Sequence, residues 1–291
     1  MAITAEFLDQ LDRFNLVIHK RVTSNYIGTR ASLASGQGLV YEDHRLYVPG
    51  DDYRWIDWKV YGRTDKLHVR RFEEERSLTI HILLDKSGSM KFMDKWDYAC
   101  MLGVGFAYLT MKENEKFQFS TFAEEVENFR PKRGRQHLAS MIQQLNAMKV
   151  SGIGDILKAA KAVKKSTFGR SLIIIISDFL YDLKNIETAL MMLSKNELKI
   201  IQLFDKKEYD LAFKGEFKLK DAETKGLLQT FISPHLQKVY KDKLGKHCAQ
   251  IKRICEDLGA EYHIVTTEQS IFDVFFEVLR EDMMARSGKV K

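Results

Sequence analysis

The residues in this sequence most suited to chemistry are oxygen-bearing side chains that could hold a cation. Asp85, Ser87 and Ser89 form the pattern Asp-x-Ser-x-Ser, with Gly88 between the two serines. One carboxylate and two hydroxyls on a short loop suit a hard divalent cation, which prefers oxygen ligands, and glycine permits the sharp bend. The pattern therefore predicts a site for Mg²⁺ or Mn²⁺.

A second carboxylate stands in a matching position. Asp178 follows the apolar run 171–177 (SLIIIIS), as Asp85 follows the apolar run 78–84 (LTIHILL). Neighbouring parallel strands end at one edge of a sheet, so we expect both carboxylates there, with their repulsion relieved by a bound cation. The ordinary alternative is that Asp and Ser after a strand serve as turn and helix-capping residues. The strand, the loop, the glycine and the second strand-ending Asp together favour the metal site.

The elements that must position these loops are predicted by short apolar runs alternating with helical patterns. Such runs predict strands at 78–84, 116–122, 171–177, 199–204 and 261–265. Helical periodicity predicts helices at 95–113, 136–148, 155–165, 186–194, 234–258 and from 271 onward. This alternation predicts an α/β fold with a mainly parallel sheet flanked by helices.

The first 76 residues break this rhythm. Residues 3–22 have the pattern of an amphipathic helix, and residues 39–72 mix short strands with turns such as Pro49-Gly50-Asp51-Asp52. No linker separates this region from the first apolar strand, at 78–84. We therefore expect 1–76 to be an N-terminal helix and β-containing extension packed on the core, and 77–291 to be the α/β domain, with a small inserted hairpin near 209–233.

Composition limits the classes of protein to consider. The three cysteines, Cys100, Cys248 and Cys255, match no zinc or disulfide spacing and are interpreted as buried, reduced thiols, which predicts a cytoplasmic protein. The N-terminus lacks the apolar stretch of a signal peptide. The uncharged run 98–111 is too short to cross a membrane, which takes about 20 residues, and predicts a buried helix.

Positive charge is concentrated in residues 130–170, which hold ten Lys or Arg and a single acid, Asp155. Such a segment could bind nucleic acid or an acidic partner. Solvated helix faces explain it better, because no aromatic residues interleave the charges as a single-strand binder needs.

The motif Asp85-x-Ser87-x-Ser89 after an apolar strand resembles the metal-ion-dependent adhesion site of von Willebrand factor A domains. The stretch 47–75 (YVPGDDYRWIDWKVYGRTDKLHVRRFEEE) is similar to a prokaryotic family described only as a domain of unknown function. Members of that family are typically encoded beside MoxR-type AAA+ ATPases. The resemblance extends over nearly the whole chain, and it implies a Rossmann-like von Willebrand factor A fold.

The resemblance also implies the ligand set: Asp85, Ser87 and Ser89 from the first loop, and Asp178 from the third. A second loop normally adds a Thr, but here the matching stretch 151–156 (SGIGDI) has Gly154 in its place. Water, Ser151 or Asp155 would have to substitute. The site is therefore expected to be partly degenerate and to bind its cation tightly only when a partner's carboxylate completes the coordination.

The charged residues of the upstream stretch have two interpretations. They could be catalytic or in contact with a partner, or they could form a buried network of ion pairs and turn caps, with Trp55 and Trp58 packed between them. The second interpretation is favoured, since dense alternating charge usually satisfies itself. The residues concerned are Asp51, Asp52, Arg54, Asp57, Arg63, Arg70 and Arg71.

These observations favour a non-catalytic protein-interaction module, an adaptor or cofactor of a MoxR-type AAA+ ATPase in complex assembly or metal insertion. The sequence has no phosphate-binding loop of the Gly-x-x-x-x-Gly-Lys type, no Gly-x-Ser-x-Gly elbow and no His pair with zinc spacing. The first alternative is a magnesium-dependent phosphohydrolase that uses Asp85 as nucleophile or metal ligand. The second is a nucleic-acid binder through 130–170.

Overall fold

The structure is a computed structural model of the chain, and it describes residues 3–24, 39–74, 79–167, 171–211, 213, 215–220 and 226–288. The chain divides into two compact units, Met1–Tyr26 with Leu78–Lys291, and Ile27–Ser77. Helix α1 (Ala5–Ser24) lies in the first unit, where Phe7 and Leu11 are buried in its core. The sequence-based division at residue 76 placed this helix with the extension, and the packing of the extension on the core stays a prediction.

The first unit is built on a six-stranded sheet with the order β10-β7-β6-β3-β4-β5. All neighbouring strands are parallel except β5, which is antiparallel to β4. The strands are β3 (Thr79–Asp85), β4 (Lys116–Phe122), β5 (Val126–Asn128), β6 (Ser171–Ser177), β7 (Glu197–Phe204) and β10 (Glu261–Thr266). The predicted Rossmann-like α/β fold, a mainly parallel sheet flanked by helices, is therefore confirmed.

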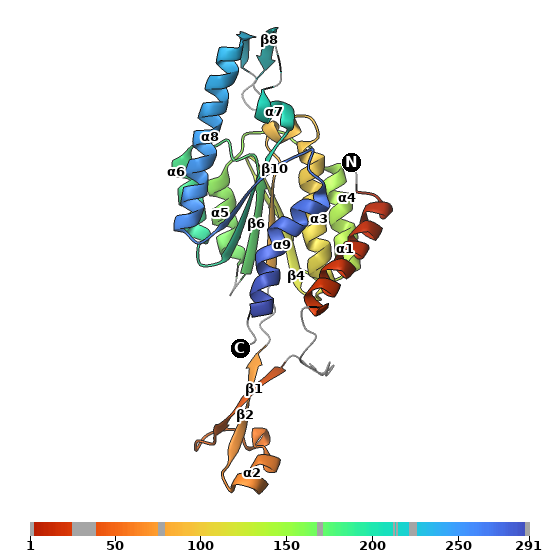
Figure 1. Cartoon of the computed structure of the whole chain (residues 1–291), viewed down its shortest axis with the longest axis vertical. Helices are drawn as coiled ribbons and strands as arrows, with labels where there is room; N and C mark the ends of the chain where they lie inside the picture. Colours follow the sequence, from red (N-terminus) through yellow and green to blue (C-terminus); the bar gives the residue numbers. More distant parts are fainter. Residues whose placement is uncertain are drawn as a thin grey trace. The chain divides into compact units, whose positions relative to one another are not determined.

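Helices cover both faces of this sheet (Figure 1). One face carries α1, α3 (Lys95–Lys112), α4 (Arg135–Ala147) and α9 (Ile271–Gly288). The other carries α5 (Ile156–Ser166), α6 (Leu183–Leu193) and α8 (Pro234–Asp257). The short helix α7 (Lys206–Asp210) comes after β7. The uncharged run 98–111 is part of the buried helix α3, as predicted, and none of the described helices is long and apolar enough to cross a membrane.

The sheet has an apolar core on each face, because successive side chains of a strand point to opposite faces. Ile82 and Leu84 of β3 lie in the core under α3, whereas Leu83 lies in the core under α5 and α6. The first core is tight where α3 meets α9, because a Cβ on Gly105 would lie 2.0 Å from the Phe275 ring. Only a residue without a side chain fits at position 105 in this packing.

Two smaller features of the first unit bear on the predictions. Strands β8 (Gly215–Lys220) and β9 (Leu227–Ile232) form a separate two-stranded antiparallel sheet within the segment where a hairpin was expected. All three cysteines are buried and free, as predicted. The cytoplasmic location inferred from them stays a prediction.

The unit Ile27–Ser77 contains the antiparallel pair β1 (Leu39–Leu46) and β2 (His68–Glu74), with the short 3₁₀ helix η1 (Tyr53–Trp55) and helix α2 (Trp58–Thr64) between them. Asp57 caps α2 by accepting hydrogen bonds from the backbone of Lys59 and Val60. That capping role agrees with the turn-cap interpretation of this residue.

Asp52 likewise caps η1 by accepting from the Arg54 N–H, but the ion pairs described in this unit are not buried as that interpretation expected. The Arg45–Asp51 and Arg54–Asp52 pairs are exposed and not buried. Trp58 is 63% exposed and packs edge-on against Tyr61 instead of between ion pairs. A unit of this size has too little interior to bury a charged network together with two tryptophans. The side chains of Arg70 and Arg71 lie outside the described residues.

Candidate functional site

The predicted site lies at the carboxyl edge of the central sheet. Strand β3 ends at Asp85 and its parallel neighbour β6 ends at Ser177, directly before Asp178. The first strand of this sheet along the chain, β3, lies inside the sheet. The next strand, β4, pairs with it on one side, and β6 pairs with it on the other. Ligands of doubly wound sheets bind at this switch point. The structure therefore brings Asp85 and Asp178 to one edge.

The loop after β3 is fixed by its own polar groups. The backbone N–H of Ser87 donates to Asp85 Oδ1 over 2.8 Å, and the hydroxyls of Ser87 and Ser89 are 3.0 Å apart. The backbone N–H of Gly88 donates to Gly152 O over 2.9 Å, which joins this loop to the second one. The three residues of the motif therefore lie together, as the sequence predicted.

The Asp85 carboxylate is fully buried and accepts hydrogen bonds on both oxygens. Besides the Ser87 N–H on Oδ1, the Ser177 hydroxyl donates to Oδ2 over 2.6 Å, and the Tyr181 hydroxyl donates to the same atom. Burial, reinforced by the charge of Asp178, raises the pKa of Asp85 to about 6. Burial and the nearby Asp85 charge also raise the pKa of Tyr181, so its phenol keeps its proton and acts as a donor.

The Asp178 carboxylate is neutralised by a lysine instead. Lys95, at the start of α3, is completely buried, and its Nζ lies 3.0 Å from Asp178 Oδ2 and 2.8 Å from Glu208 Oε2. Burial opposes the charge of Lys95, but the two carboxylates outweigh it and raise its pKa. The ammonium is therefore charged and held between two acids.

The loop that carries Asp178 has a strained backbone. Phe179 is completely buried and has φ of +53°, a left-handed conformation that is costly for an aromatic residue. Its N–H donates to Ser177 Oγ over 3.0 Å, and its carbonyl accepts from His247 Nε2 over 2.8 Å. Gln202 Nε2 donates to Asp178 O over 2.6 Å. These contacts hold the loop in one shape.

The second loop differs most from what a metal site needs. Asp155 caps α5 by accepting from the Lys158 N–H over 2.9 Å, so its carboxylate is engaged in the helix terminus. Ser151 is exposed, and its N–H donates to Lys86 O over 3.0 Å. At Gly154 a Cβ would lie 2.2 Å from the Tyr181 hydroxyl. The phenol of Tyr181 therefore occupies the space that a side chain at position 154 would need.

These contacts test whether the residues fit a divalent cation. The 3.0 Å between the Ser87 and Ser89 hydroxyls matches the separation of about 3 Å between neighbouring ligands of an octahedral Mg²⁺. Both oxygens of Asp85, however, already accept hydrogen bonds, and Asp178 faces an ammonium. No group of three or more His, Cys, Asp or Glu side chains in the described part of the chain could hold a metal ion. The hydroxyls fit a divalent cation, and the arrangement as a whole does not.

Sequence reasoning missed Lys95, Tyr181 and Glu208. A lysine in the first turn of a helical pattern normally points to solvent, and the sequence offers no local spacing that relates it to Asp178. Two features of the sequence pointed to Tyr181. It comes soon after the strand-ending Asp178, and Gly154 stands where a larger residue was expected. Only the folded structure shows that Tyr181 occupies the space beside Gly154.

Comparisons with solved structures give distant similarities. The conserved hypothetical protein BatB from Bacteroides thetaiotaomicron is similar over 72% of this chain and 99% of that chain, with 15% identity and a TM-score of 0.46. Proximal thread matrix protein 1 from the mussel byssus, with a zinc-occupied MIDAS motif, is similar over 72% of this chain and 46% of that chain, with 11% identity and a TM-score of 0.38.

Sequence comparisons identify the family. The family described as "Protein of unknown function DUF58" matches residues 43–250. The uncharacterized protein Rv1480 of Mycobacterium tuberculosis (strain ATCC 25618 / H37Rv) is 26% identical over 267 residues, which cover 89% of this chain and 84% of that protein. Neither description names an enzymatic activity. The family match includes all three loops of the candidate site.

Proposed function

The chain belongs to the DUF58 family, and we propose that it is a non-catalytic protein-interaction module that binds a partner at the carboxyl edge of its sheet. The partner proposed is a MoxR-type AAA+ ATPase, for which the chain acts as an adaptor or cofactor in complex assembly or metal insertion. The partner comes from the family resemblance of the sequence. The binding edge comes from the geometry of the three loops.

The observation that carries the proposal is that each loop at this edge exposes an apolar side chain. Met93 is 49% exposed, Ile153 is 49% exposed and Leu180 is 46% exposed. Each comes from a different loop of the edge, and the three loops are tied together by backbone bonds and by the contact between Gly154 and Tyr181. Exposed apolar residues gathered on a rigid edge are typical of a protein-binding surface.

A hollow of about 490 Å³ adjoins this edge. Its lining combines apolar side chains with both signs of charge, and consists of Lys91, Met93, Trp96, Asp97, Met148, Lys149, Val150 and Ser151. Such a lining suits an amphipathic peptide segment, which places apolar side chains in the groove and polar ones at its rim.

The contacts of Asp85 argue against the phosphohydrolase alternative. A nucleophilic carboxylate needs an oxygen free to attack, whereas both oxygens of Asp85 accept hydrogen bonds and the residue has no exposed surface. A lysine that could clamp a phosphate, Lys95, does lie beside Asp178. This lysine is buried and paired with two carboxylates, so its charge is already used.

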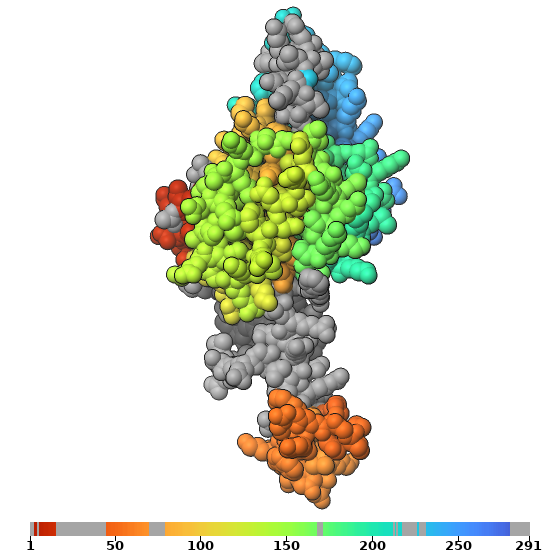
Figure 2. Space-filling view, turned by 180° about the vertical axis from the view of Figure 1, so that it is seen from behind, coloured from red at the N-terminus to blue at the C-terminus, as the bar shows by residue number. Residues whose placement is uncertain are grey.

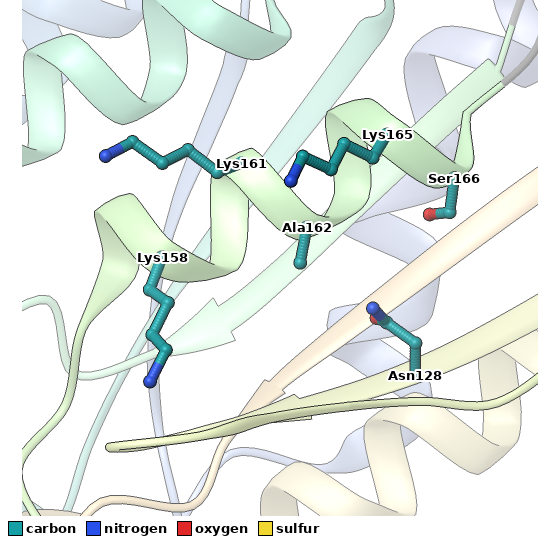
Figure 3. A pocket seen from close by; sticks show the side chains of 6 residues that line it. All are labelled: Asn128, Lys158, Lys161, Ala162, Lys165 and Ser166. Atoms are coloured by element: carbon teal, nitrogen blue, oxygen red, sulfur yellow. The ribbon is translucent and has the colours of Figure 1, made fainter.

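The basic segment remains the second alternative. Its described part, residues 130–167, spreads over much of the face seen in Figure 2, coloured yellow-green to green. A shallow hollow between α5 and β5 is lined by Asn128, Lys158, Lys161, Ala162, Lys165 and Ser166 (Figure 3). No aromatic side chain lines it, and the buried face of α5 is apolar. The lysines therefore fit a solvated helix face better than a nucleic-acid site.

The test is binding of the purified chain to a MoxR-type AAA+ ATPase from the same organism, measured by biolayer interferometry. Leu180→Glu and Ile153→Glu are expected to weaken binding about tenfold or more, because each puts a charge into an apolar contact. Met191→Glu is the matched control, since Met191 is 58% exposed on α6 near the far end of that helix. Equal affinity of all four proteins would contradict the proposed edge, and no binding by wild type would contradict the proposed partner.

Binding of Mg²⁺ or Mn²⁺ at Asp85, Ser87, Ser89 and Asp178 was expected from the motif and is untested, and the contacts of Asp85 and Asp178 argue against it in the free chain. The proposed function does not depend on it.

A further inference from the structure

The candidate site keeps one half of a cation-binding arrangement. Ser87 has no exposed surface and Ser89 is half-buried, and their hydroxyls are spaced like two neighbouring ligands of one ion. Ser87 precedes the 3₁₀ turn η2 (Gly88–Lys91), but its hydroxyl makes no capping bond. Local helix capping therefore does not explain why the two hydroxyls face one another.

The other half is filled by Tyr181. Its hydroxyl donates to Asp85 Oδ2, and it can reach that atom only because position 154 has no side chain. A threonine at 154 and the present position of Tyr181 exclude each other, since the added Cβ would lie 2.2 Å from the phenol oxygen. The glycine at position 154 and the hydrogen bond from Tyr181 to Asp85 therefore depend on one another.

Lys95 supplies the positive charge at the same edge. Its ammonium lies between Asp178 and Glu208 with no exposed surface. A divalent cation bound through Asp178 would lie close to this ammonium in an interior where like charges repel strongly. It would have to displace Lys95 from Asp178, which would leave Glu208 as the one carboxylate paired with the ammonium among the described residues.

We propose that Lys95 and Tyr181 take the place of the divalent cation in this chain, so that the ammonium neutralises Asp178, the phenol satisfies Asp85, and the site works without a metal. The side chains of Lys95 and Tyr181 then hold the loops in their binding shape, where a bound cation would otherwise do so. The proposal concerns the free chain and does not rest on the proposed function, except for one consequence: partner binding at this edge would be insensitive to chelators.

The opposite half of the sheet provides a control for this proposal. Lys199 on β7 is also completely buried, and its Nζ lies 2.6 Å from Glu261 Oε2 and 3.1 Å from Val278 O. Replacing either lysine by methionine removes a buried ammonium of the same size. Only the Lys95 change frees a carboxylate at the edge that carries Ser87 and Ser89.

The test is calorimetric titration of the purified chain with MnCl₂ alone, repeated with MgCl₂. Wild type is expected to show no saturable binding stronger than a Kd of about 1 mM. The variant Gly154→Thr/Tyr181→Ala adds a third hydroxyl and frees Asp85, and with Lys95→Met it also frees Asp178. The variant that includes Lys95→Met is expected to bind Mn²⁺ at least tenfold more tightly than wild type. The control carries Gly154→Thr, Tyr181→Ala and Lys199→Met, and it is expected to bind Mn²⁺ more weakly than the variant with Lys95→Met.

Each outcome decides the proposal. Saturable binding of Mn²⁺ or Mg²⁺ by wild type at micromolar concentration would overturn it, and this measurement needs no variant to fold. If circular dichroism shows that the variant with Lys95→Met is folded and it still binds no Mn²⁺, then Lys95 and Tyr181 are not what replaces the cation, and the proposal fails. No partner protein is present, so these results are independent of whether the chain binds a MoxR-type ATPase.

Discussion

The two ends of the central sheet each bury a lysine, and they use it differently. Lys199, near the start of β7, pairs with Glu261 and the carbonyl of Val278, and Glu261 also lies 3.5 Å from His263. Lys95, at the carboxyl edge, is held between Asp178 and Glu208 and shares that edge with the buried Asp85. At the first end, Glu261 has Lys199 and His263 beside it, and His263 also lies 3.5 Å from Glu277. At the other end, the Lys95 ammonium pairs with two acids, and a third acid, Asp85, lies at the same edge.

This difference indicates which end is functional. At the Lys199 end, the buried ammonium has Glu261 and the carbonyl of Val278 as partners, and a histidine lies beside the same acid. The Lys95 end gathers excess negative charge, a strained Phe179 backbone and exposed apolar residues on the surrounding loops. A buried lysine alone therefore does not mark a site. An unbalanced cluster of acids at the switch point of the sheet does.

The largest expected effect separates the two lysines directly. Lys95→Met leaves the buried Asp178 and the half-buried Glu208 without their cation and is expected to lower the free energy of unfolding by about 3–5 kcal/mol. Lys199→Met should cost less, because His263 remains beside Glu261. Urea denaturation of both variants measures the difference. If Lys199→Met were the more damaging change, the proposed imbalance between the two ends would be wrong.

A pH titration probes the amino half of the sheet. Burial lowers the pKa of His81 on β3 to about 4, so the folded state resists its protonation. The unfolded chain binds the extra proton below pH 6.5, and stability should therefore fall as the pH drops from about 6.5 to 4, by up to about 3 kcal/mol. His81→Phe should remove this part of the acid-side loss. Asp85 is the same in both proteins, so the difference between their urea midpoints across this range isolates His81, and identical pH profiles would contradict the burial effect.

The smallest effect is expected in the unit Ile27–Ser77. The Arg45–Asp51 pair is exposed, and exposed pairs contribute little because solvent screens them. Arg45→Ala should therefore leave the urea midpoint of the chain unchanged within error, in contrast to Lys95→Met. A large shift would mean that this pair is buried against something in the folded chain.

Much of this architecture could be predicted from the sequence, for physical reasons that apply to particular residues. Runs such as Leu172–Ile176 have to be buried strands, and strands that alternate with helices have to form a mainly parallel sheet, which places Asp85 and Asp178 together. β5 was missed because three residues with no apolar pattern give no strand signal. Trp58 was expected between ion pairs because large aromatics are usually buried, yet its small unit leaves it exposed.

The interior of the site could not be predicted in the same way. Tyr181 reaches Asp85 across 96 positions of sequence, and Lys95 reaches Asp178 across 83. No periodicity or capping rule relates residues so far apart. The departure at Gly154 was visible in the sequence, but its cause, the phenol of Tyr181, became visible only in three dimensions.

The most direct test of the closed, metal-free site is anomalous diffraction from crystals of wild-type chain soaked in MnCl₂. We expect no anomalous peak between Ser87 and Ser89, with the Tyr181 hydroxyl on Asp85 and the Lys95 ammonium on Asp178. A manganese peak bound by the two serine hydroxyls, with Tyr181 displaced from Asp85, would contradict this account.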